Sequence, residues 1–576
     1  MDNTRIVEKL KLTASLLELH SENPFKVNSY NSAAWKIEKT EVDLSQLSIE
    51  QLENLEGVGK SIAKIIDQLN QHGEFELLNH LLEITPQGVI DMLKIQGVGP
   101  KKIGVIWREL NIENAHDLLK ACEEGKLAKL KGFGTKIQEN IIHAIQYKKS
   151  VQNKFLYREA EKIANDLVER IKSALNPLLI SLAGELRRNM EIINTVELVV
   201  AVKSFGEFAQ QLDKWSDIEK KVSLSGPFCW RGQFITPHDL DLNIWLCSPE
   251  QFHNTLIRHT GNTTHLSTQV NESNLLKVIS EKSLQNETEA YRELGLPFIP
   301  PELREGMFEY VWAGDNQMPS LVEYSDLKGI LHNHSSYSDG KQTLREMAVH
   351  CKELGFEYFG ISDHSKTAIY ANGLEEDRIK KQHQEIDQLN QELAPFKIFK
   401  GIESDILLDG SLDYNPEILE TFDFVVASIH SSFSMDSEKT TNRLLNTIRN
   451  PYTTILGHLT GRLLLKRDGY PLDHKAIIDA CAEHQVIIEI NANPLRLDLD
   501  WRWVPYAMEK QVLITINPDA HNKKDLELMY YGVCAGRKGG LTKEYTLNCL
   551  NLFQIDEYFK TRKHRALKAS KVNLIP

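Results

Sequence analysis

The chain has 576 residues, of which 41% are hydrophobic and 26% are charged, and its formal net charge is −13. This length predicts roughly two to four domains. The acidic balance excludes a protein that binds nucleic acid through its overall charge alone, so any such contact must use local donors. There is no apolar run long enough to cross a membrane and no secretory signal pattern, and the seven cysteines form no C-x-x-C pair. We therefore expect a cytoplasmic protein with no membrane partner and no disulfide partner.

Residues 1–150 are predicted to be helical, because apolar residues recur at helical spacing and alternating β-branched residues are rare. A short pattern occurs three times in this region: LEGVG at 55–59, IQGVG at 95–99 and LKGFG at 130–134. Each copy is followed by a helix-patterned run, and the copies lie about 35–40 residues apart, which indicates an internal repeat.

The repeated G-x-G pattern is suited to contact with a phosphate. Glycine permits a tight turn with positive φ and leaves no side chain in the way. The backbone N–H groups of the turn and of the next helix can then face a phosphate, whatever the base sequence. A single copy is more often a plain connecting turn, but three copies resemble helix-hairpin-helix motifs and favour DNA binding. The glycines concerned are Gly57, Gly59, Gly97, Gly99, Gly132 and Gly134.

Residues 151–318 are predicted to form a mixed α/β domain. Strand-like runs occur at 177–184, 196–202 and 239–246, and a proline-bearing segment follows at 294–306. A linker is expected near 312–326.

The last predicted domain, residues 326–576, has a regular rhythm of seven short apolar runs, most of them separated by helix-patterned segments. This alternation predicts a parallel barrel or a doubly wound sheet. Metal-ligand residue types fall at or just past the C-terminal ends of the runs, the face where parallel barrels carry their active sites. We expect nine ligands spread over the seven strand ends: His332, His334, Asp339, His364, Glu403, His430, His458, Asp519 and His521.

One histidine at a strand end is more often a satisfied polar residue than a ligand, but nine ligand-type residues at one face indicate a metal site. His332 and His334 are two residues apart, so both point to the same side of a strand. Imidazoles combined with carboxylates suit zinc, manganese or iron(II) better than calcium or magnesium. Because nine ligands exceed the needs of one ion, we expect two or three divalent ions, a set suited to hydrolysing a phosphate ester.

These residues carry a family resemblance. Residues 332–340 (HNHSSYSDG) resemble the opening motif of the PHP (polymerase and histidinol phosphatase) domain, and residues 361–365, 401–403, 428–431, 457–458 and 519–521 resemble its later motifs. The resemblance implies a distorted (β/α)7 barrel with a trinuclear zinc or manganese centre. It assigns His332, His334, Glu403 and Asp519 to the first ion, Glu403, His430 and His458 to the second, and Asp339, His364 and His521 to the third.

The rest of the chain resembles bacterial family X DNA polymerases (PolX). Residues 19–27 are similar to the start of that family, residues 184–191 (GELRRNME) to its palm motif, and residues 297–305 (PFIPPELRE) to a segment typical of its bacterial members. The resemblance covers essentially the whole chain, and it implies a nucleotidyltransferase-like palm and thumb in residues 151–318.

The polymerase chemistry carries over less well. The family places Asp-x-Asp where this chain has Thr195 and Glu197, and only the third carboxylate, Asp241, is retained. A neutral threonine cannot replace a carboxylate that bridges two Mg²⁺ ions, and glutamate is one methylene too long for a position with strict geometry. Asp241 and Glu197 are therefore predicted to form a degenerate catalytic pair, and Mg²⁺ binding in the palm is doubtful.

A further departure lies in the palm motif itself. Glu185 replaces the family's serine, and its carboxylate would repel an incoming triphosphate. Arg188, which matches the family's phosphate-binding arginine, is kept and is assigned to DNA binding. We predict that templated polymerisation is lost.

The leading hypothesis is a metal-dependent DNA 3′–5′ exonuclease or phosphodiesterase of DNA repair, acting on gapped, nicked or single-stranded DNA. Three alternatives stay open: a gap-filling polymerase that uses Glu197 and Asp241, a small-molecule phosphatase, and a DNA-binding scaffold without catalysis. The hairpin repeats count against the phosphatase, and the complete ligand set counts against the scaffold.

Overall fold

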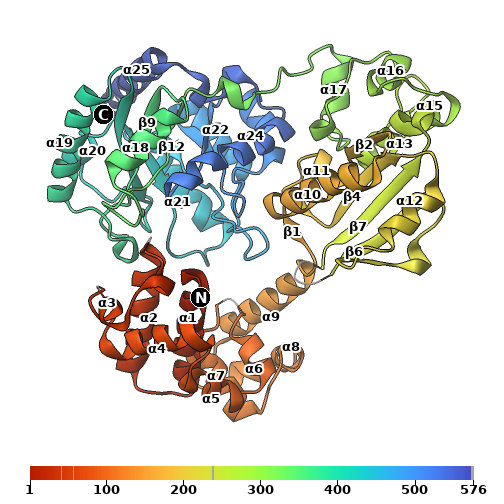
Figure 1. Cartoon of the computed structure of the whole chain (residues 1–576). Coiled ribbons are helices and arrows are strands. Elements are labelled where there is room, and N and C mark those ends of the chain that lie inside the picture. Colours follow the sequence, from red (N-terminus) through yellow and green to blue (C-terminus); the bar gives the residue numbers. More distant parts are fainter. Residues whose placement is uncertain (41, 56, 96, 236–238, 573–576) are drawn as a thin grey trace. The chain divides into compact units, whose positions relative to one another are not determined.

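A computed structural model of the chain describes residues 1–576 except 41, 56, 96, 236–238 and 573–576 (Figure 1). The chain forms two compact units, Met1–Gln152 and Asn153–Pro576. Among the described helices, none combines the length and the apolar character needed to cross a membrane.

The first unit is helical throughout its described residues, as predicted. Its helices are α1 (Asn3–Leu19), α2 (Pro24–Lys39), α3 (Ile49–Glu53), α4 (Lys60–His72), α5 (Glu76–Glu83), α6 (Gln87–Met92), α7 (Pro100–Leu110), α8 (Ala115–Glu123) and α9 (Thr135–Ser150), with 3-10 turns η1 (Leu44–Gln46) and η2 (Leu127–Lys129). Local signals set the starts: Asp2 caps α1 by accepting from the Arg5 N–H, and Ser48 and Gln51 form a capping box on α3. The apolar faces of these helices share one core.

The second unit begins with a mixed domain. Its elements are β1 (Phe155–Leu156), α10 (Tyr157–Leu175), β2 (Leu179–Leu182), α11 (Gly184–Arg187), β3 (Ile192–Ile193), β4 (Thr195–Ala201), α12 (Phe205–Leu212), β5 (Ile218–Lys220), η3 (Val222–Leu224), β6 (Cys229–Phe234), β7 (Asp241–Cys247), η4 (Pro249–Gln251), α13 (Phe252–Thr260), α14 (Thr263–Ser267), α15 (Leu275–Glu281), α16 (Glu287–Glu293), η5 (Pro301–Leu303) and α17 (Glu309–Gly314). Five strands form a sheet in the order β2-β4-β7-β6-β5, in which only β4 and β7 are parallel. The three expected strands are β2, β4 and β7, and the sequence reading missed β5 and β6.

The remainder of the unit is a seven-stranded parallel barrel. Its strands are β8 (Gly329–Ile330), β9 (Tyr358–Ile361), β10 (Lys397–Asp405), β11 (Phe424–Ser428), β12 (Ile455–Leu456), β13 (Ile487–Asn491) and β14 (Ile514–Asn517). The helices are α18 (Leu344–Glu353), α19 (Glu376–Glu392), α20 (Pro416–Leu419), α21 (Ser437–Arg449), α22 (His474–His484), α23 (Val504–Glu509), α24 (Met529–Lys538) and α25 (Leu552–Val572), and the 3-10 turns are η6 (Tyr324–Asp326), η7 (Ile369–Ala371), η8 (Trp501–Trp503), η9 (Lys523–Leu528), η10 (Lys543–Tyr545) and η11 (Leu547–Cys549).

The barrel strands pair in chain order, each parallel to the next. The ends of the sheet come together past β8 and β14, where Asn333 and Ala520 form a parallel bridge and the His334 N–H donates to the Ala520 carbonyl at 2.8 Å. The barrel is therefore nearly closed. Nearly every strand residue is buried, which explains why these strands appear in the sequence as continuous apolar runs.

Charged contacts join the palm directly to the barrel. Lys538 of α24 is 1% exposed, and its Nζ donates to the Arg188 carbonyl at 2.9 Å and to Glu305 Oε1 at 2.6 Å. Part of the expected linker is also docked, because Val322 is fully buried and its N–H donates to the Leu541 carbonyl. These contacts explain why residues 153–576 form one compact unit.

Candidate metal centre

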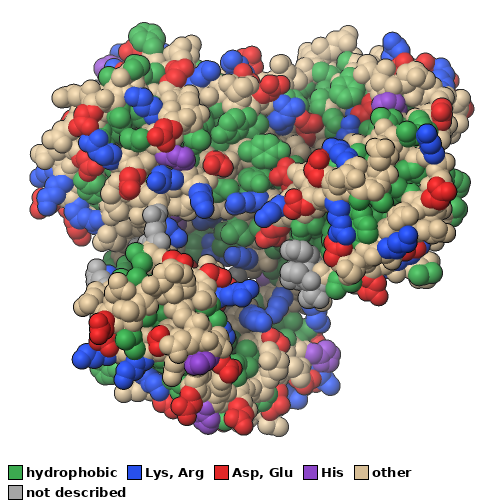
Figure 2. Space-filling model, viewed as in Figure 1, with side chains coloured by type: hydrophobic (Ala, Val, Ile, Leu, Met, Phe, Trp, Pro, Cys, Tyr) green, Lys and Arg blue, Asp and Glu red, His purple; other side chains and the backbone are tan. Residues whose placement is uncertain are grey.

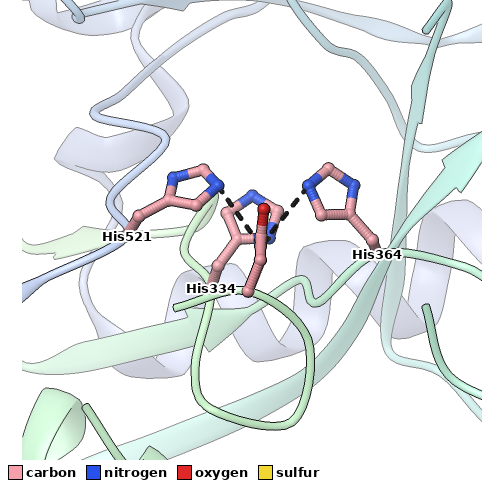
Figure 3. Close-up of side chains that lie close together, drawn as sticks. His334, His364 and His521 are labelled. Carbon is pink, nitrogen blue, oxygen red and sulfur yellow. Dashed lines mark ion pairs between the residues drawn. The ribbon is translucent and has the colours of Figure 1, made fainter. Parts of the chain in front are cut away.

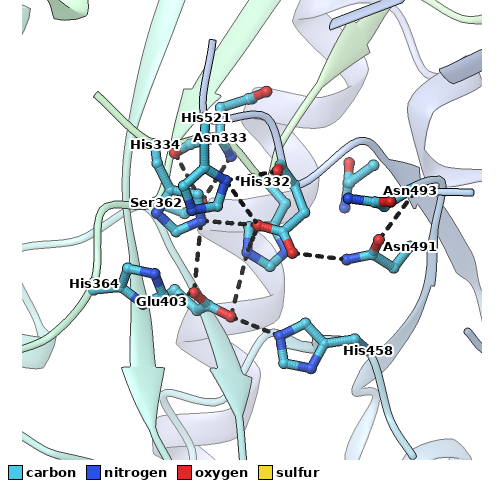
Figure 4. A network of polar contacts seen from close by, with 12 residues as sticks. His332, Asn333, His334, Ser362, His364, Glu403, His458, Asn491, Asn493 and His521 are labelled. Carbon is cyan, nitrogen blue, oxygen red and sulfur yellow. Dashed lines mark hydrogen bonds and ion pairs between the residues drawn. The ribbon is translucent and has the colours of Figure 1, made fainter. Parts of the chain in front are cut away.

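The nine residues singled out as ligands gather at one end of the barrel, around the C-terminal ends of its strands, and Figure 4 shows six of them: His332, His334, His364, Glu403, His458 and His521. They lie at or beyond six strands, and the expectation of a ligand at all seven strand ends is wrong, because β13 carries none of them. Instead, β13 directs Glu489 and Asn491 toward the ligands.

Three groups of ligand atoms lie close enough to hold ions. In each group the atoms are within 4.8 Å of one another: His332, His334 and Asp519; His364, Glu403 and His430; and His334, Asp339, His364 and His521. Figure 3 shows His334, His364 and His521 of the last group pointing toward one another. These groups overlap strongly with the three ligand sets implied by the family resemblance, although His458 is in none of them.

Glu403 lies at the middle of the centre and is 1% exposed. Its Oε1 is 3.4, 3.3 and 3.1 Å from Nε2 of His332, His430 and His458. Its Oε2 is 3.0 Å from His364 Nδ1 and 3.6 Å from His334 Nε2. One carboxylate thus faces five imidazoles, the arrangement expected of a group that bridges two ions.

The residues fit divalent ions, because several of their buried polar atoms form no hydrogen bond and lie only beside other ligand-type residues. Among the described residues, five such atoms without a hydrogen bond belong to the centre: His332 Nε2, His334 Nδ1, His364 Nδ1, Glu403 Oε2 and His458 Nδ1. Buried polar atoms are rarely left unpaired in folded proteins, and ion coordination is one ordinary reason. Two ligands also have left-handed backbone, His458 with φ +26° and Asp519 with φ +53°, a strain that gathers at functional sites.

The electrostatics keep the carboxylates charged. Burial acts to raise the pKa of Glu403, but His430, His332 and His364 hold it well below its usual range. The pKa of Asp519 is held low in the same way, by His332, His334 and His521. Burial, together with the neighbouring His521 and His364, lowers the pKa of His334 to about 3, so this imidazole is neutral, as a metal ligand must be.

Two carboxylates outside the ligand set orient ligand imidazoles, and the sequence reading assigned neither. Glu489 Oε1 is 2.7 Å from His332 Nδ1, and its Oε2 accepts the His458 N–H at 2.9 Å. Asp405 Oδ1 is 2.7 Å from His430 Nδ1. A carboxylate on Nδ1 fixes the ring and leaves Nε2 free to face the centre. A signal existed in the sequence, since Glu489 interrupts an otherwise apolar strand.

A buried acid also fixes the loop that carries the first ligands. Asp363 is fully buried and accepts hydrogen bonds from the N–H and Oγ of Ser335 and of Ser338, and from Gln382 Nε2. This loop links His334 to Asp339. Asp363, which belongs to residues 361–365, therefore holds the loop of residues 332–340 in place.

The palm shows a different arrangement. In the register of β4 and β7, Thr195 lies beside Asp241 and Glu197 beside Asn243. Asp241 is paired with Lys221 Nζ at 2.5 Å, and Glu197 Oε1 accepts from Trp245 Nε1 at 3.2 Å. Burial raises the pKa of Glu197. The groups of three or more ligand-type residues found among the described residues all lie in the barrel.

The substituted Glu185 and the retained Arg188 of the palm motif are also engaged in contacts. Glu185 turns to Asn194, accepting from its N–H at 2.6 Å and from its Nδ2 at 2.7 Å. Arg188 donates through Nε to Glu305 Oε1 at 2.8 Å and through Nη1 to the Thr260 carbonyl at 2.7 Å. Arg188 is 9% exposed, so its predicted contact with DNA would require these bonds to open.

The hairpin glycines occupy three equivalent turns of the first unit, and α4, α7 and α9 begin directly after them. Gly57, Gly97 and Gly132 have φ of +83°, +80° and +87°, the conformation that only glycine adopts without strain. The second glycines, Gly59, Gly99 and Gly134, precede their helices without any side-chain cap and face open space. In the described part of the chain, no side-chain cap therefore covers the starts of these three helices. Residues 56 and 96 of the repeats lie outside the described part.

Comparison with known families agrees with this architecture. Residues 1–75 match the family described as helix-hairpin-helix domain, residues 89–147 the SAM-like helix-hairpin-helix tandem, and residues 331–493 the PHP domain.

Individual relatives extend the comparison. A probable phosphatase of Thermoanaerobacter sp. (strain X514) is 29% identical over 187 residues, which cover 31% of this chain and 74% of the relative. A probable phosphatase of Vibrio atlanticus (strain LGP32) is 29% identical over 208 residues, 34% of this chain and 79% of the relative. The DNA polymerase/3'-5' exonuclease PolX of Bacillus subtilis (strain 168) is 35% identical over 572 residues, which cover 97% of this chain and 100% of that protein. With its hairpin unit, mixed middle sheet and PHP barrel, the chain belongs to the bacterial PolX family of DNA polymerase/3'-5' exonucleases.

Proposed function

We propose that this protein is a metal-dependent 3′–5′ exonuclease of DNA repair and that the barrel hydrolyses the phosphodiester bond. The observation that carries the proposal is the set of buried ligand groups joined through Glu403, in a chain whose other unit holds helix-hairpin-helix repeats. The full-length Bacillus relative is named as a 3'-5' exonuclease as well as a polymerase. Gapped, nicked or single-stranded DNA is the proposed substrate.

The ligand residues support two or three ions, with zinc and manganese as the candidates. Divalent ions held there would supply activation of water near neutral pH and neutralisation of charge on phosphoryl oxygens. The chain's own residues prepare that chemistry. Glu403 and Asp519 stay anionic, while Glu489 and Asp405 hold the rings of His332 and His430 in place.

We further propose that templated polymerisation is lost. Three features support this proposal: Thr195 stands where the family has an aspartate, Asp241 is neutralised by Lys221, and Arg188 is occupied by Glu305. A catalytic site for phosphoryl transfer needs preorganised charge around two ions, and these contacts work against it.

The decisive experiment is digestion of 3′-labelled and 5′-labelled single-stranded and gapped DNA by protein loaded with Mn²⁺ or Zn²⁺, without nucleotides. We expect stepwise shortening from the 3′ end and none with His332→Ala, while DNA binding is retained. If the His332→Ala protein kept full nuclease activity, the barrel would not be the nuclease site.

Two results would favour other functions. The matches to probable phosphatases make a small-molecule phosphatase the main alternative. Release of phosphate from small monoesters, with no degradation of DNA under any metal, would favour it. Template-dependent incorporation on gapped DNA that disappears in Asp241→Ala would instead show that a polymerase using Glu197 and Asp241 survives.

A further inference from the structure

A groove of about 830 Å³ lies where helix α10 of the palm meets two loops of the barrel. One wall comes from α10 and includes Arg158 and Lys162. The other wall comes from residues 464–466, which include Lys466, and from residues 493–495. The groove belongs to neither the hairpin glycines nor the ligand groups.

The groove is locally basic although the chain is acidic. Arg158, Lys162 and Lys466 are all exposed, and among the described residues none of the three forms an ion pair. The lining holds these three cations and two carboxylates, and both carboxylates accept hydrogen bonds from neighbouring residues. Glu161 accepts from the hydroxyls of Tyr157 and Tyr530, and Glu159 accepts from the Leu156 N–H. Figure 2 shows several Lys and Arg side chains on the lower edge of the barrel, next to the palm.

The groove also offers an aromatic surface. Tyr531 lines it and is only partly buried, and the Arg158 guanidinium lies 6.0 Å from the centre of its ring. Cations that follow a backbone, with an aromatic ring and side-chain amides beside them, are the combination that binds single-stranded nucleic acid without regard to sequence.

One residue of the groove lining is linked to the metal centre by hydrogen bonds. Asn493 lines the groove, and its N–H donates to Asn491 Oδ1 at 3.1 Å (Figure 4). Asn491 Nδ2 donates in turn to Oδ2 of the ligand Asp519 at 3.1 Å. Asn493 is therefore two hydrogen bonds from the candidate ligand Asp519.

The loop that contains Asn493 also contains Arg496, whose guanidinium has a nitrogen without a hydrogen bond among the described residues. Arg496 Nε is 3.7 Å from Asp519 Oδ2, and among the described residues its buried Nη1 has no hydrogen-bond partner. An unpaired guanidinium N–H beside a hydrolytic centre is suited to a phosphate oxygen.

We propose that the groove binds the sugar–phosphate backbone of the single strand whose end is hydrolysed, with Arg496 contacting the innermost phosphate. The inference rests on the proposed function. It assigns Lys162 and Lys466 to the adjacent phosphates and Tyr531 to stacking with a base.

The test compares Lys162→Ala/Lys466→Ala with Lys172→Ala, which removes a lysine from the far end of the same helix. The probe is a thymidine oligonucleotide of about five nucleotides, followed by fluorescence anisotropy over a range of salt concentrations. Loss of two phosphate contacts should weaken binding roughly tenfold and lower the slope of log Kd against log salt by about 1.4. The Lys172→Ala protein should bind as the unchanged protein does.

A second measurement separates this inference from the proposed function. Hydrolysis of bis(p-nitrophenyl) phosphate, which is too small to occupy the groove, should be unchanged in the double variant, whereas KM for the oligonucleotide should rise with kcat preserved. Equal oligonucleotide binding by the double variant and Lys172→Ala would overturn the groove assignment. Binding of an acidic peptide, with no binding of the oligonucleotide, would also overturn the groove assignment. If the unchanged protein cleaved no DNA but the binding difference persisted, the exonuclease proposal would fail and the groove would stand.

Discussion

The barrel and the palm each carry carboxylates on parallel strands, but the two regions give these carboxylates different partners. In the barrel, Glu403 faces five imidazoles, and buried ligand atoms are left without other partners. In the palm, Asp241 is bound by Lys221 and Glu197 by Trp245. Having acids on neighbouring strands is therefore not enough to make two regions alike. What matters is whether neighbouring residues leave the acids free for an ion.

The largest expected effect is a loss of DNA hydrolysis when an aspartate is replaced by alanine in the barrel but not in the palm. Asp519→Ala should lower metal-dependent hydrolysis of DNA about a thousandfold or more, because it removes a ligand that also lies beside three histidines. Asp241→Ala should leave hydrolysis within about twofold, since no ligand group includes it. Initial rates on 3′-labelled single-stranded DNA measure both. Comparable losses in the two variants would break the contrast between barrel and palm.

The next effect is on the free energy of unfolding, and it comes from a buried ion-pair group in the palm. Glu287 pairs with Arg187 at 2.6 Å and with the fully buried Arg304 at 3.0 Å. Glu287→Gln should lower the free energy of unfolding by about 3–5 kcal/mol, because two guanidiniums lose their common partner. Glu293→Gln, at a half-exposed pair with Lys282, is the control and should cost less than about 1 kcal/mol. Denaturant unfolding at neutral pH distinguishes the two variants.

The pH dependence of the Glu287 effect has a defined direction. Burial acts to raise the pKa of Glu287, but Arg187 and Arg304 lower it from 4.5 to about 2. Because the folded-state pKa is depressed, the stabilisation is present above about 4.5 and is lost as pH falls toward 2. The difference between Glu287→Gln and the unchanged protein should therefore shrink over that range. A difference that stays constant down to the lower limit would contradict the ion-pair account.

A smaller effect is expected from an orienting residue of the barrel. Glu489→Gln should weaken metal binding about 10–100-fold, because His332 loses the charged acceptor on Nδ1. Metal content after dialysis against graded chelator measures this loss without any assay of activity. Glu483→Gln, an exposed acid on the neighbouring helix α22, serves as the matched control. Equal metal retention in the two variants would reduce Glu489 to a packing role.

The smallest effect belongs to the hairpin unit. Gly99 has negative φ and faces open space, so Gly99→Val costs little in folding but places a side chain before the first-turn N–H groups of α7. Loss of about one hydrogen bond to phosphate should raise Kd for DNA about fivefold. Gly226→Val, at another open glycine in the mixed domain, should leave Kd unchanged. Hydrolysis of a small chromogenic diester should not respond to either change.

The barrel was the more predictable region because parallel strands carry a strong local signal. Each buried strand is an apolar run, and its ligands follow within a few positions, as His364 follows β9. Residues 218–220 and 229–234 were missed as β5 and β6, because these short strands contain charged residues and a glycine and alternate in burial. Short half-buried strands of this kind depend on their neighbours for definition.

The contacts between residues far apart in the sequence could not be predicted from the motifs. His332 and Glu489 are separated by 157 positions, and Arg188 and Glu305 by 117. The pairing of Lys221 with Asp241 depends on how β6 and η3 pack against β7, which the sequence pattern does not specify. The motifs therefore located the residues that gather at the candidate metal centre, whereas the contacts that each acid makes are seen only in the folded chain.

The buried Lys538 has a practical consequence for dividing this protein. Its ammonium is held by Glu305 and by the Arg188 carbonyl, so the barrel's last long helix before the C-terminal one completes its contacts on the palm. A fragment cut between residues 318 and 326 would open this junction to water, and it would also uncover Trp501, whose indole now donates to Glu191. A cut after Gln152 crosses no such junction within Asn153–Pro576. For expression or crystallisation of the candidate metal centre, residues 153–576 are therefore the fragment to prepare, with the palm kept as its structural support.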